Sequence, residues 1–262
     1  MLTRATAIEA RHKVLLVDDD AVCLELTALM LAHEGHQVLR AHDAGSAFAM
    51  LAGDQTTRPD VLLVDLQMPG ISGGQLAEKV RAMDAPDQRP LLLAMSATQA
   101  GRQQVTAFDG FLLKPLAMDD LRRALNPRKA SRAAKKPAAP LAPVSQQPLD
   151  MAVVAKLLAM MPAASLSELI TASIADTRAS ITALKTNLQD LTAVMQTAHR
   201  IKGAAAMIGA SRIARLAATL EAGGDKAAAT PVILDDLLIA CIELERMLLA
   251  GKLKQQPQGP RP

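Results

Sequence analysis

The segment Lys13-Val-Leu-Leu-Val-Asp-Asp-Asp20 decides the fold of the first part of this 262-residue chain. Its unbroken aliphatic run is typical of a strand that is buried on both faces of a parallel sheet. Similar runs recur, and we predict strands at Lys13–Val17, Gln37–Ala41, Val61–Val64, Leu91–Met95 and Gly110–Leu113. Helical stretches between them start near Asp20, Asp43, Gly73, Thr98 and Met118. Five β-α units predict an α/β fold, a doubly wound parallel sheet sandwiched by helices.

The composition changes between Asn126 and Pro148, where five prolines and a basic cluster replace the apolar periodicity. This change predicts a linker at 127–148, between a first domain at 12–126 and a second at 149–252. The second domain carries i, i+3/i+4 apolar spacing and no strand signal, which predicts an all-α antiparallel bundle. Its predicted helices are Leu149–Met161, Ser165–Leu188, Leu191–Ile208, Ser211–Ala222 and Pro231–Ala250.

The composition disfavours nucleic acid and membranes as partners. Aromatic residues make up 1 % of the chain, so stacking platforms for single-stranded nucleic acid are lacking. Seven basic residues and no acid lie between Arg122 and Lys136, but no helix-turn-helix or zinc module accompanies them, so we favour a solvated tail over a phosphate contact. Cys23 and Cys241 lie in apolar helical patterns and are expected to be buried thiols. No signal-peptide or membrane-span pattern occurs, and we expect a cytoplasmic protein.

Acidic and polar residues gather where the predicted strands end, at the edge of the sheet where ligands bind in this kind of fold. These residues are Asp18, Asp19, Asp20, Asp65, Ser96 and Lys114. Three converging carboxylates beside one lysine predict a hard divalent cation, Mg²⁺. The alternative is helix N-capping, which suits Asp20 and Asp43. Capping does not explain Asp65, which precedes Leu-Gln-Met-Pro-Gly rather than a helix start.

Five motifs in residues 12–126 resemble the receiver domains of bacterial response regulators, which have a flavodoxin-like fold. They are Val17-Asp-Asp19, Asp65-Leu-Gln-Met-Pro-Gly70, Gly73-Gly74, Met95-Ser-Ala97 and Phe111-Leu-Leu-Lys-Pro115. The resemblance implies that Asp65 is the phosphoacceptor and that Asp18, Asp19, Asp65 and the backbone carbonyl of Gln67 hold Mg²⁺. It also implies that Ser96 and Lys114 contact the phosphoryl oxygens and that the Lys114–Pro115 bond is cis.

These implied roles agree with the chemistry of phosphoryl transfer, which depends on charge neutralisation and positioning. One departure concerns the fourth helix. Ser96 and Lys114 are 18 residues apart, about one helical turn fewer than is usual in the family, so the helix expected at Thr98–Thr106 should be short. Because this region forms the family's dimer face, the usual mode of dimerisation is not carried over.

The informative stretch of the second domain is Ala198-His-Arg-Ile-Lys-Gly203. At 100° per residue, an apolar stripe faces the bundle core, and His199 lies about 110° from its centre, on a flank that we expect to be exposed. The stripe consists of Leu191, Val194, Ala198, Ile201, Ala205 and Ile208. An isolated surface histidine would be inert. Gly203 beside it weakens the helix by about 1 kcal/mol relative to alanine, which suggests that access to the imidazole offsets this cost.

The pattern His199-x-x-Lys202-Gly203 with the later Gly209 resembles the histidine phosphotransfer (Hpt) domain. Glu221 and Leu149-Asp150 also fit, and the resemblance spans about residues 149–250. It implies that His199 is phosphorylated and that Lys202 and Gly203 shape its surroundings. A neutral imidazole nitrogen is a nucleophile at pH 7, and a nearby ammonium would stabilise its phosphoryl group.

The combined motifs predict a phosphorelay intermediate, not a kinase, because no phosphate-binding loop or nucleotide lid is present. A sensor histidine kinase would phosphorylate Asp65, and His199 would exchange the group with Asp65 or with a downstream response regulator. The alternative is a phosphorylation-switched protein that sequesters a kinase or regulator through the helical surface without turnover. The 23 residues from Asn126 to Pro148 span about 25–30 Å as a flexible coil, so exchange within one molecule is possible unless the domains dock with the two residues apart.

Overall fold

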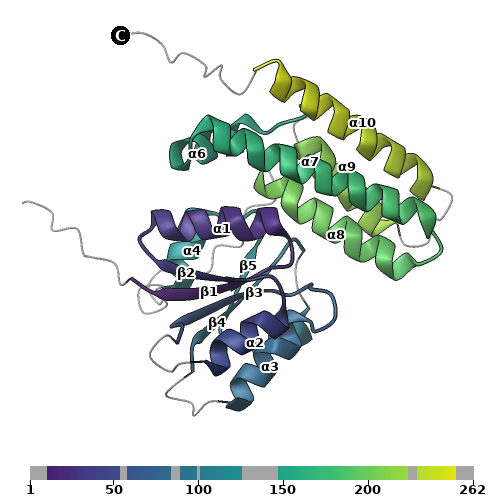
Figure 1. Ribbon diagram of the computed structural model, residues 1–262. Helices are drawn as coiled ribbons and strands as arrows, with labels where there is room; N and C mark the ends of the chain where they lie inside the picture. Colours follow the sequence, from purple (N-terminus) through teal and green to yellow (C-terminus); the bar gives the residue numbers. More distant parts are fainter. Residues whose placement is uncertain are drawn as a thin grey trace, which may run out of the picture.

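The computed structural model describes residues 11–53, 58–83, 89–98, 101–125, 147–223 and 229–251. Figure 1 shows two parts, an α/β domain and a helical bundle that lies over one of its helices. The predicted linker at 127–148 falls outside the described residues except for its last two positions, as does most of the basic cluster.

The α/β domain contains one parallel sheet of five strands in the order β2-β1-β3-β4-β5. Its strands are β1 (Lys13–Val17), β2 (Gln37–Ala41), β3 (Val61–Asp65), β4 (Leu91–Ser96) and β5 (Gly110–Leu113). Its helices are α1 (Ala21–His33), α2 (Ala44–Ala52), α3 (Gly73–Met83) and α4 (Met118–Leu125), with a 3₁₀ helix, η3, at Arg102–Val105. The doubly wound fold and all five predicted strands are confirmed, because the continuous aliphatic runs bury both faces of the sheet.

Alternate strand residues face two separate apolar layers. Leu16 and Leu63 pack with α1 and α4, whereas Leu15 and Leu62 pack with α2 and α3. All four side chains are fully buried. Figure 1 shows the same division, with α1 and α4 on one face of the sheet and α2 and α3 on the other. This arrangement leaves the carboxyl ends of the strands at one edge.

The region between β4 and β5 differs from the expected helix at Thr98–Thr106. Among the described residues of this region, which leave out 99 and 100, the 3₁₀ helix η3 is the one helical element, and it begins at Arg102 rather than near Thr98. The short connection explains the difference, because it must also return the chain to β5. The Lys114–Pro115 peptide bond is cis, as predicted.

The helical bundle begins at Met151. Its helices are α6 (Met151–Met160), α7 (Ala163–Thr186), α8 (Leu191–Met207), α9 (Ser211–Ala222) and α10 (Thr230–Leu249). The five predicted helices are confirmed to within two residues at each end. Asp150 and Asp190 cap α6 and α8 by accepting hydrogen bonds from backbone amides of the first turn. Gly209 ends α8 with φ +76°, a conformation that favours glycine.

Helix α1 packs against both the sheet and the helical bundle. It contacts the sheet on one side and α6, α7 and α8 on the other, and one apolar core runs through both parts. Its buried residues cover most of its circumference, as expected for a helix with neighbours on two sides. They are Val22, Cys23, Leu24, Leu26, Thr27, Ala28, Met30 and Leu31. The α/β domain and the bundle are therefore packed together rather than independent.

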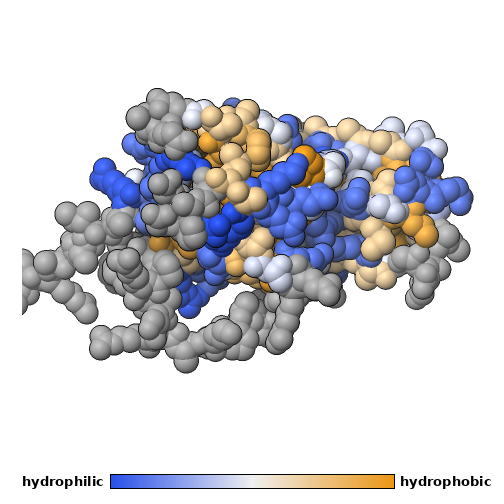
Figure 2. All heavy atoms as spheres, turned by 90° about the horizontal axis from the view of Figure 1, so that it is seen from below, coloured by the Kyte–Doolittle hydropathy of each residue, from blue (hydrophilic) through white to orange (hydrophobic). Residues whose placement is uncertain are grey.

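Most apolar side chains of the described residues lie in these cores. On the part of the lower face that Figure 2 colours, hydrophilic residues surround small, scattered hydrophobic groups. Cys23 and Cys241 are buried free thiols, as predicted. None of the described helices is long and apolar enough to cross a membrane.

Candidate functional site

The carboxyl ends of β1, β3, β4 and β5 bring together the residues predicted from the α/β half of the sequence. The parallel register places Val17 beside Val64 and Asp65 beside Met95, so the residues that follow each strand meet at one edge. Of the residues gathered there, Asp18, Asp65, Ser96 and Lys114 are buried and Asp19 is half-buried.

An acidic cluster forms the floor of this site. Oxygen atoms of Asp18, Asp19 and Asp65 lie within 4.8 Å of one another. Carboxylate oxygens at this spacing are a donor set that fits a hard divalent cation. Lys114 Nζ donates to Asp18 Oδ2 at 2.7 Å and to Asp65 Oδ2 at 2.5 Å. When the three carboxylates are ionised, one ammonium leaves the cluster with a negative charge.

Burial and mutual repulsion alter the acidity of this cluster. Burial raises the pKa of Asp18 to about 7, although the attraction of Lys114 opposes the shift. Burial, and then the neighbouring Asp65 carboxylate, also raise the pKa of Asp19. Burial disfavours the charged form of Lys114, but Asp18 and Asp65 outweigh it and raise the Lys114 pKa well above its ordinary value. The lysine is therefore a permanent cation in this site.

Backbone contacts fix the orientation of Asp65. The Gln67 amide donates to Asp65 Oδ1 at 3.0 Å, and the Thr98 amide donates to Ser96 Oγ at 3.2 Å. A side chain at Gly73 would place Cβ 2.1 Å from the Asp65 carbonyl oxygen, so only glycine lets α3 start this close to Asp65. Asp20 caps α1 by accepting from the Cys23 amide at 2.8 Å, the role that the sequence predicted for it.

Helix α8 carries the second predicted centre, His199. Its Nδ1 atom lies 2.7 Å from Glu221 Oε1 on α9, and Lys202 Nζ donates to Glu221 Oε2 at 2.5 Å. Burial opposes ionisation of Glu221, but its bonds to His199 and Lys202 outweigh burial and lower its pKa. An ionised carboxylate only accepts hydrogen bonds, so Nδ1 carries the proton and Nε2 of the neutral ring keeps its lone pair.

The expectation that His199 is exposed is wrong, because its side chain is buried with 4 % exposure. The flank of α8 that the periodicity leaves uncovered is covered by the α/β domain. A Cβ atom at Gly203 would lie 3.6 Å from Ala97 Cβ and 3.8 Å from Lys114 Cδ, so α8 and the α/β domain touch here. Leu191 also differs from the predicted stripe. It is 45 % exposed at the first turn of α8, whereas the other five residues are buried.

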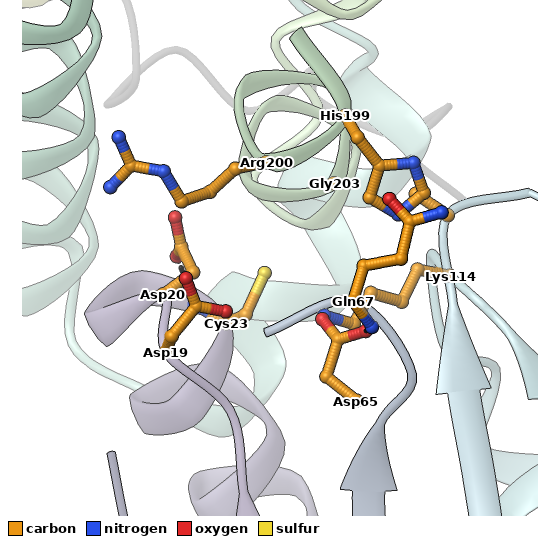
Figure 3. Close-up of a pocket in the computed structure, with 10 residues that line it drawn as sticks. Asp19, Asp20, Cys23, Asp65, Gln67, Lys114, His199, Arg200 and Gly203 are labelled. Atoms are coloured by element: carbon orange, nitrogen blue, oxygen red, sulfur yellow. Dashed lines mark hydrogen bonds and ion pairs between the residues drawn. The ribbon is translucent and has the colours of Figure 1, made fainter. Parts of the chain in front are cut away.

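The two predicted centres line one pocket between the α/β domain and the bundle, with about 230 Å³ of empty space including open solvent. Figure 3 shows His199 and Gly203 on α8 above Asp65, Gln67 and Lys114. The Nε2 atom of His199 is buried and has no hydrogen-bond partner among the described residues. The domains therefore dock with Asp65 and His199 together, not apart.

Arg200 is a pocket residue that the sequence did not indicate. It lines the pocket opposite His199, beside Asp19 and Asp20 (Figure 3). On the bundle side, its Nη2 atom donates to Ser180 Oγ at 2.7 Å and its Nη1 atom lies 3.5 Å from Asp176 Oδ2. Its position next to His199 in the sequence could have suggested a role in the site. The helical periodicity of the bundle, however, does not show that Arg200 lies near an acidic residue of the other domain.

Comparison with known proteins agrees with both resemblances. A family model for the response regulator receiver domain matches residues 14–126, and one for the Hpt domain matches residues 166–258. The virulence sensor protein BvgS of Bordetella pertussis is 30 % identical over 95 % of this chain, which spans 21 % of that protein. The sensor histidine kinase AruS of Pseudomonas aeruginosa is 36 % identical over 43 % of this chain, which spans 12 % of that protein.

Among solved structures, the chemotaxis protein CheY4 of Vibrio cholerae is similar to the α/β part. It is 27 % identical and covers 45 % of this chain and 98 % of its own, with a TM-score of 0.40.

Proposed function

Because this chain is a two-component signalling protein, with a response regulator receiver domain followed by an Hpt domain, we propose that it is a phosphorelay intermediate. Asp65 accepts a phosphoryl group from a sensor histidine kinase and exchanges it with His199 of the same chain, which passes it to a downstream response regulator. The observation that carries this proposal is the single pocket that both residues line.

The first step makes an acyl phosphate on Asp65. A carboxylate oxygen of Asp65 attacks the phosphorus of the donor, and the bond between phosphorus and the donor atom breaks. Lys114, within hydrogen-bond distance of this carboxylate, is placed to neutralise charge on the phosphoryl oxygens. The Ser96 hydroxyl would donate to another of these oxygens.

The acidic cluster suits Mg²⁺. Asp18, Asp19, Asp65 and the backbone carbonyl of Gln67 would hold the ion, since the three carboxylates already converge. When bound, the ion supplies positive charge for the phosphoryl group. Lys114 alone does not balance the three carboxylates, which supports a second cation at this site.

The second step moves the phosphoryl group to the imidazole. The lone pair of His199 Nε2 attacks phosphorus, a bond from Nε2 to phosphorus forms, and the bond from Asp65 oxygen to phosphorus breaks. Asp65 returns as a carboxylate beside Lys114. The ring keeps its proton on Nδ1 and gains positive charge, which the Glu221 carboxylate at 2.7 Å stabilises. Lys202 positions Glu221 rather than the phosphoryl group, because it is already paired with that carboxylate.

Chemical lability of the label tests this proposal. Wild-type protein, Asp65→Asn and His199→Gln are incubated with Mg²⁺ and radiolabelled acetyl phosphate, a small acyl phosphate donor. An acyl phosphate is lost in base and a phosphohistidine in acid. We expect both kinds of label on the wild-type chain, only base-labile label on His199→Gln, and none on Asp65→Asn.

Acid-labile label that survives the His199→Gln change would contradict the role of His199. Retention of the full label by Asp65→Asn would contradict the role of Asp65. If the wild-type chain carried only base-labile label, the alternative, a phosphorylation-switched binding protein without turnover, would replace the relay.

A further inference from the structure

We infer that the packed arrangement is a closed state, in which the chain's own receiver domain occupies the Hpt surface that carries His199. In this state, neither phosphoacceptor is open to another protein, and the two domains separate before a phosphoryl group enters or leaves the chain. This inference rests on the proposed function for the identity of the outside partners, but the closure itself rests on contacts and burial.

Both phosphoacceptors are buried in the docked arrangement. Asp65 is 5 % exposed and His199 is 4 % exposed. Phosphoryl transfer brings the attacking and leaving atoms within about 3–3.5 Å of the reacting centre, so a partner's histidine or aspartate must enter the pocket itself. Residues of both domains of the same chain line this pocket. An outside domain can therefore reach Asp65 only where the Hpt domain now lies, and His199 only where the receiver domain lies.

Helix α1 packs between the two domains. Helix α1 contacts α6, α7 and α8, and the apolar core continues from the receiver domain into the Hpt domain. Its sequence, AVCLELTALMLAH, has apolar residues on nearly all sides, with Glu25 as its one acid and His33 as its one basic residue. Such a helix is suited to burial between two layers rather than to an exposed face. The receiver domain thus carries an apolar surface that the Hpt domain covers.

Opposite charges also meet where the two domains are docked. The receiver pocket is negative, and the Hpt domain presents Arg200 to its Asp19 side. Arg200 lines the same pocket as Asp19 and Asp20, so its positive charge faces the acidic side of the site. Asp176 and Ser180 on α7 hold Arg200 from behind. Arg200 therefore contributes a cation to the acidic cluster only while the domains are docked.

A small residue at position 203 permits this approach. An added methyl group would meet Ala97 and Lys114 at 3.6 and 3.8 Å, which is ordinary contact, so the additional atoms of a leucine side chain are expected to crowd these two neighbours. This difference provides a matched pair of variants. Gly203→Ala should keep the domains docked, and Gly203→Leu should hold them apart.

Carbethoxylation of histidine by diethyl pyrocarbonate tests the closed state in the full chain without any phosphate. The reagent modifies neutral imidazole nitrogens, and the modified residues are followed by peptide mass spectrometry. His33 and His42 are exposed and serve as internal references. We expect His199 to react at least about tenfold more slowly than these two residues in the wild-type chain and in Gly203→Ala. In Gly203→Leu it should react at a rate within about threefold of theirs.

A second wedge variant, in which a larger side chain is again meant to hold the domains apart, guards against an effect of the Gly203→Leu change on α8 itself. Ala97→Leu places the extra volume on the receiver side and leaves the Hpt sequence unchanged, and it should also release His199. Far-UV circular dichroism checks that each variant is folded. Rapid modification of wild-type His199 would overturn the closed state, as would slow modification in both folded wedge variants. Because this readout needs no phosphoryl group, it can fail while the relay stands, and the relay can fail while the closed state stands.

Discussion

Replacing Glu221 by glutamine should slow phosphoryl transfer to His199 without unfolding the protein. The Glu221 carboxylate accepts from His199 Nδ1 at 2.7 Å and from Lys202 Nζ at 2.5 Å. A glutamine side chain has nearly the same shape, but its amide oxygen carries no charge. The change therefore removes the charge that opposes the positive imidazole while leaving an acceptor in place.

The size of the effect follows from the kind of bond that is lost. Hydrogen bonds to charged groups contribute about 1.5–3 kcal/mol, and neutral ones about 0.5–1.5 kcal/mol. The difference of about 1–2 kcal/mol in the transition state corresponds to a rate about 5- to 30-fold lower. The assay is a single-turnover measurement of label moving from Asp65 to His199.

Glu243→Gln provides the matched control, because Glu243 pairs with Arg212 elsewhere on the Hpt domain. It should transfer at the wild-type rate. Nitrogen-15 NMR of the His199 ring should show the proton on Nδ1 in wild-type protein and a mixture of tautomers in Glu221→Gln. If Glu221→Gln transferred as fast as Glu243→Gln, our account of the imidazole would be refuted.

The difference in stability between wild-type protein and Glu221→Gln should depend on pH. The pKa of Glu221 is lowered in the folded protein from its usual 4.5. A lowered carboxyl pKa means that its stabilisation is complete above pH 4.5 and is lost as the pH falls through the folded value. The excess unfolding free energy of wild-type protein over Glu221→Gln should therefore be constant above pH 4.5 and shrink below it.

Three further changes address the receiver site. Asp19→Ala should weaken Mg²⁺ binding at least about tenfold in a calorimetric titration, because it removes one of three converging carboxylates; unchanged affinity would mean that they do not share one ion. Gly73→Ala should destabilise the protein by about 3 kcal/mol in urea unfolding, because its Cβ would overlap the Asp65 carbonyl oxygen, and a neutral effect would contradict this packing. Lys114→Met should cost about 3–5 kcal/mol at pH 7 by leaving the Asp18 and Asp65 carboxylates buried without their cation; the loss should become smaller at lower pH, and a loss independent of pH would count against this reasoning.

The receiver half could be predicted closely because its signals are local. Aliphatic runs such as Val61–Val64 can be buried on both faces only in a covered sheet, and parallel strands bring their carboxyl ends to one edge. From this geometry, the sequence predicts that Asp18, Asp65 and Lys114 lie together. The helix expected within Thr98–Thr106 is short, as predicted, but the described residues form it as the 3₁₀ helix η3 starting at Arg102, because the short connection must also return the chain to β5.

The burial of His199 could not be predicted from α8 alone. Helical periodicity identifies the side of a helix that faces its own bundle, but it does not show which other domain covers the remaining flank. The relevant signal lay in α1, whose apolar residues surround most of the helix and require cover on two sides. Arg200 was missed for the same reason, since its acidic neighbour Asp19 lies in the other domain.

The dependence of the transfer rate on protein concentration tests the central claim, exchange between Asp65 and His199 of one molecule, most directly. The chain is phosphorylated on Asp65, diluted over about a hundredfold range, and the appearance of acid-labile label is followed in time. Two residues tethered in one docked chain should exchange with a first-order rate that does not change on dilution. A mixture of Asp65→Asn and His199→Gln should remain slow. A rate that rises in proportion to concentration, with full transfer restored in that mixture, would contradict the intramolecular relay.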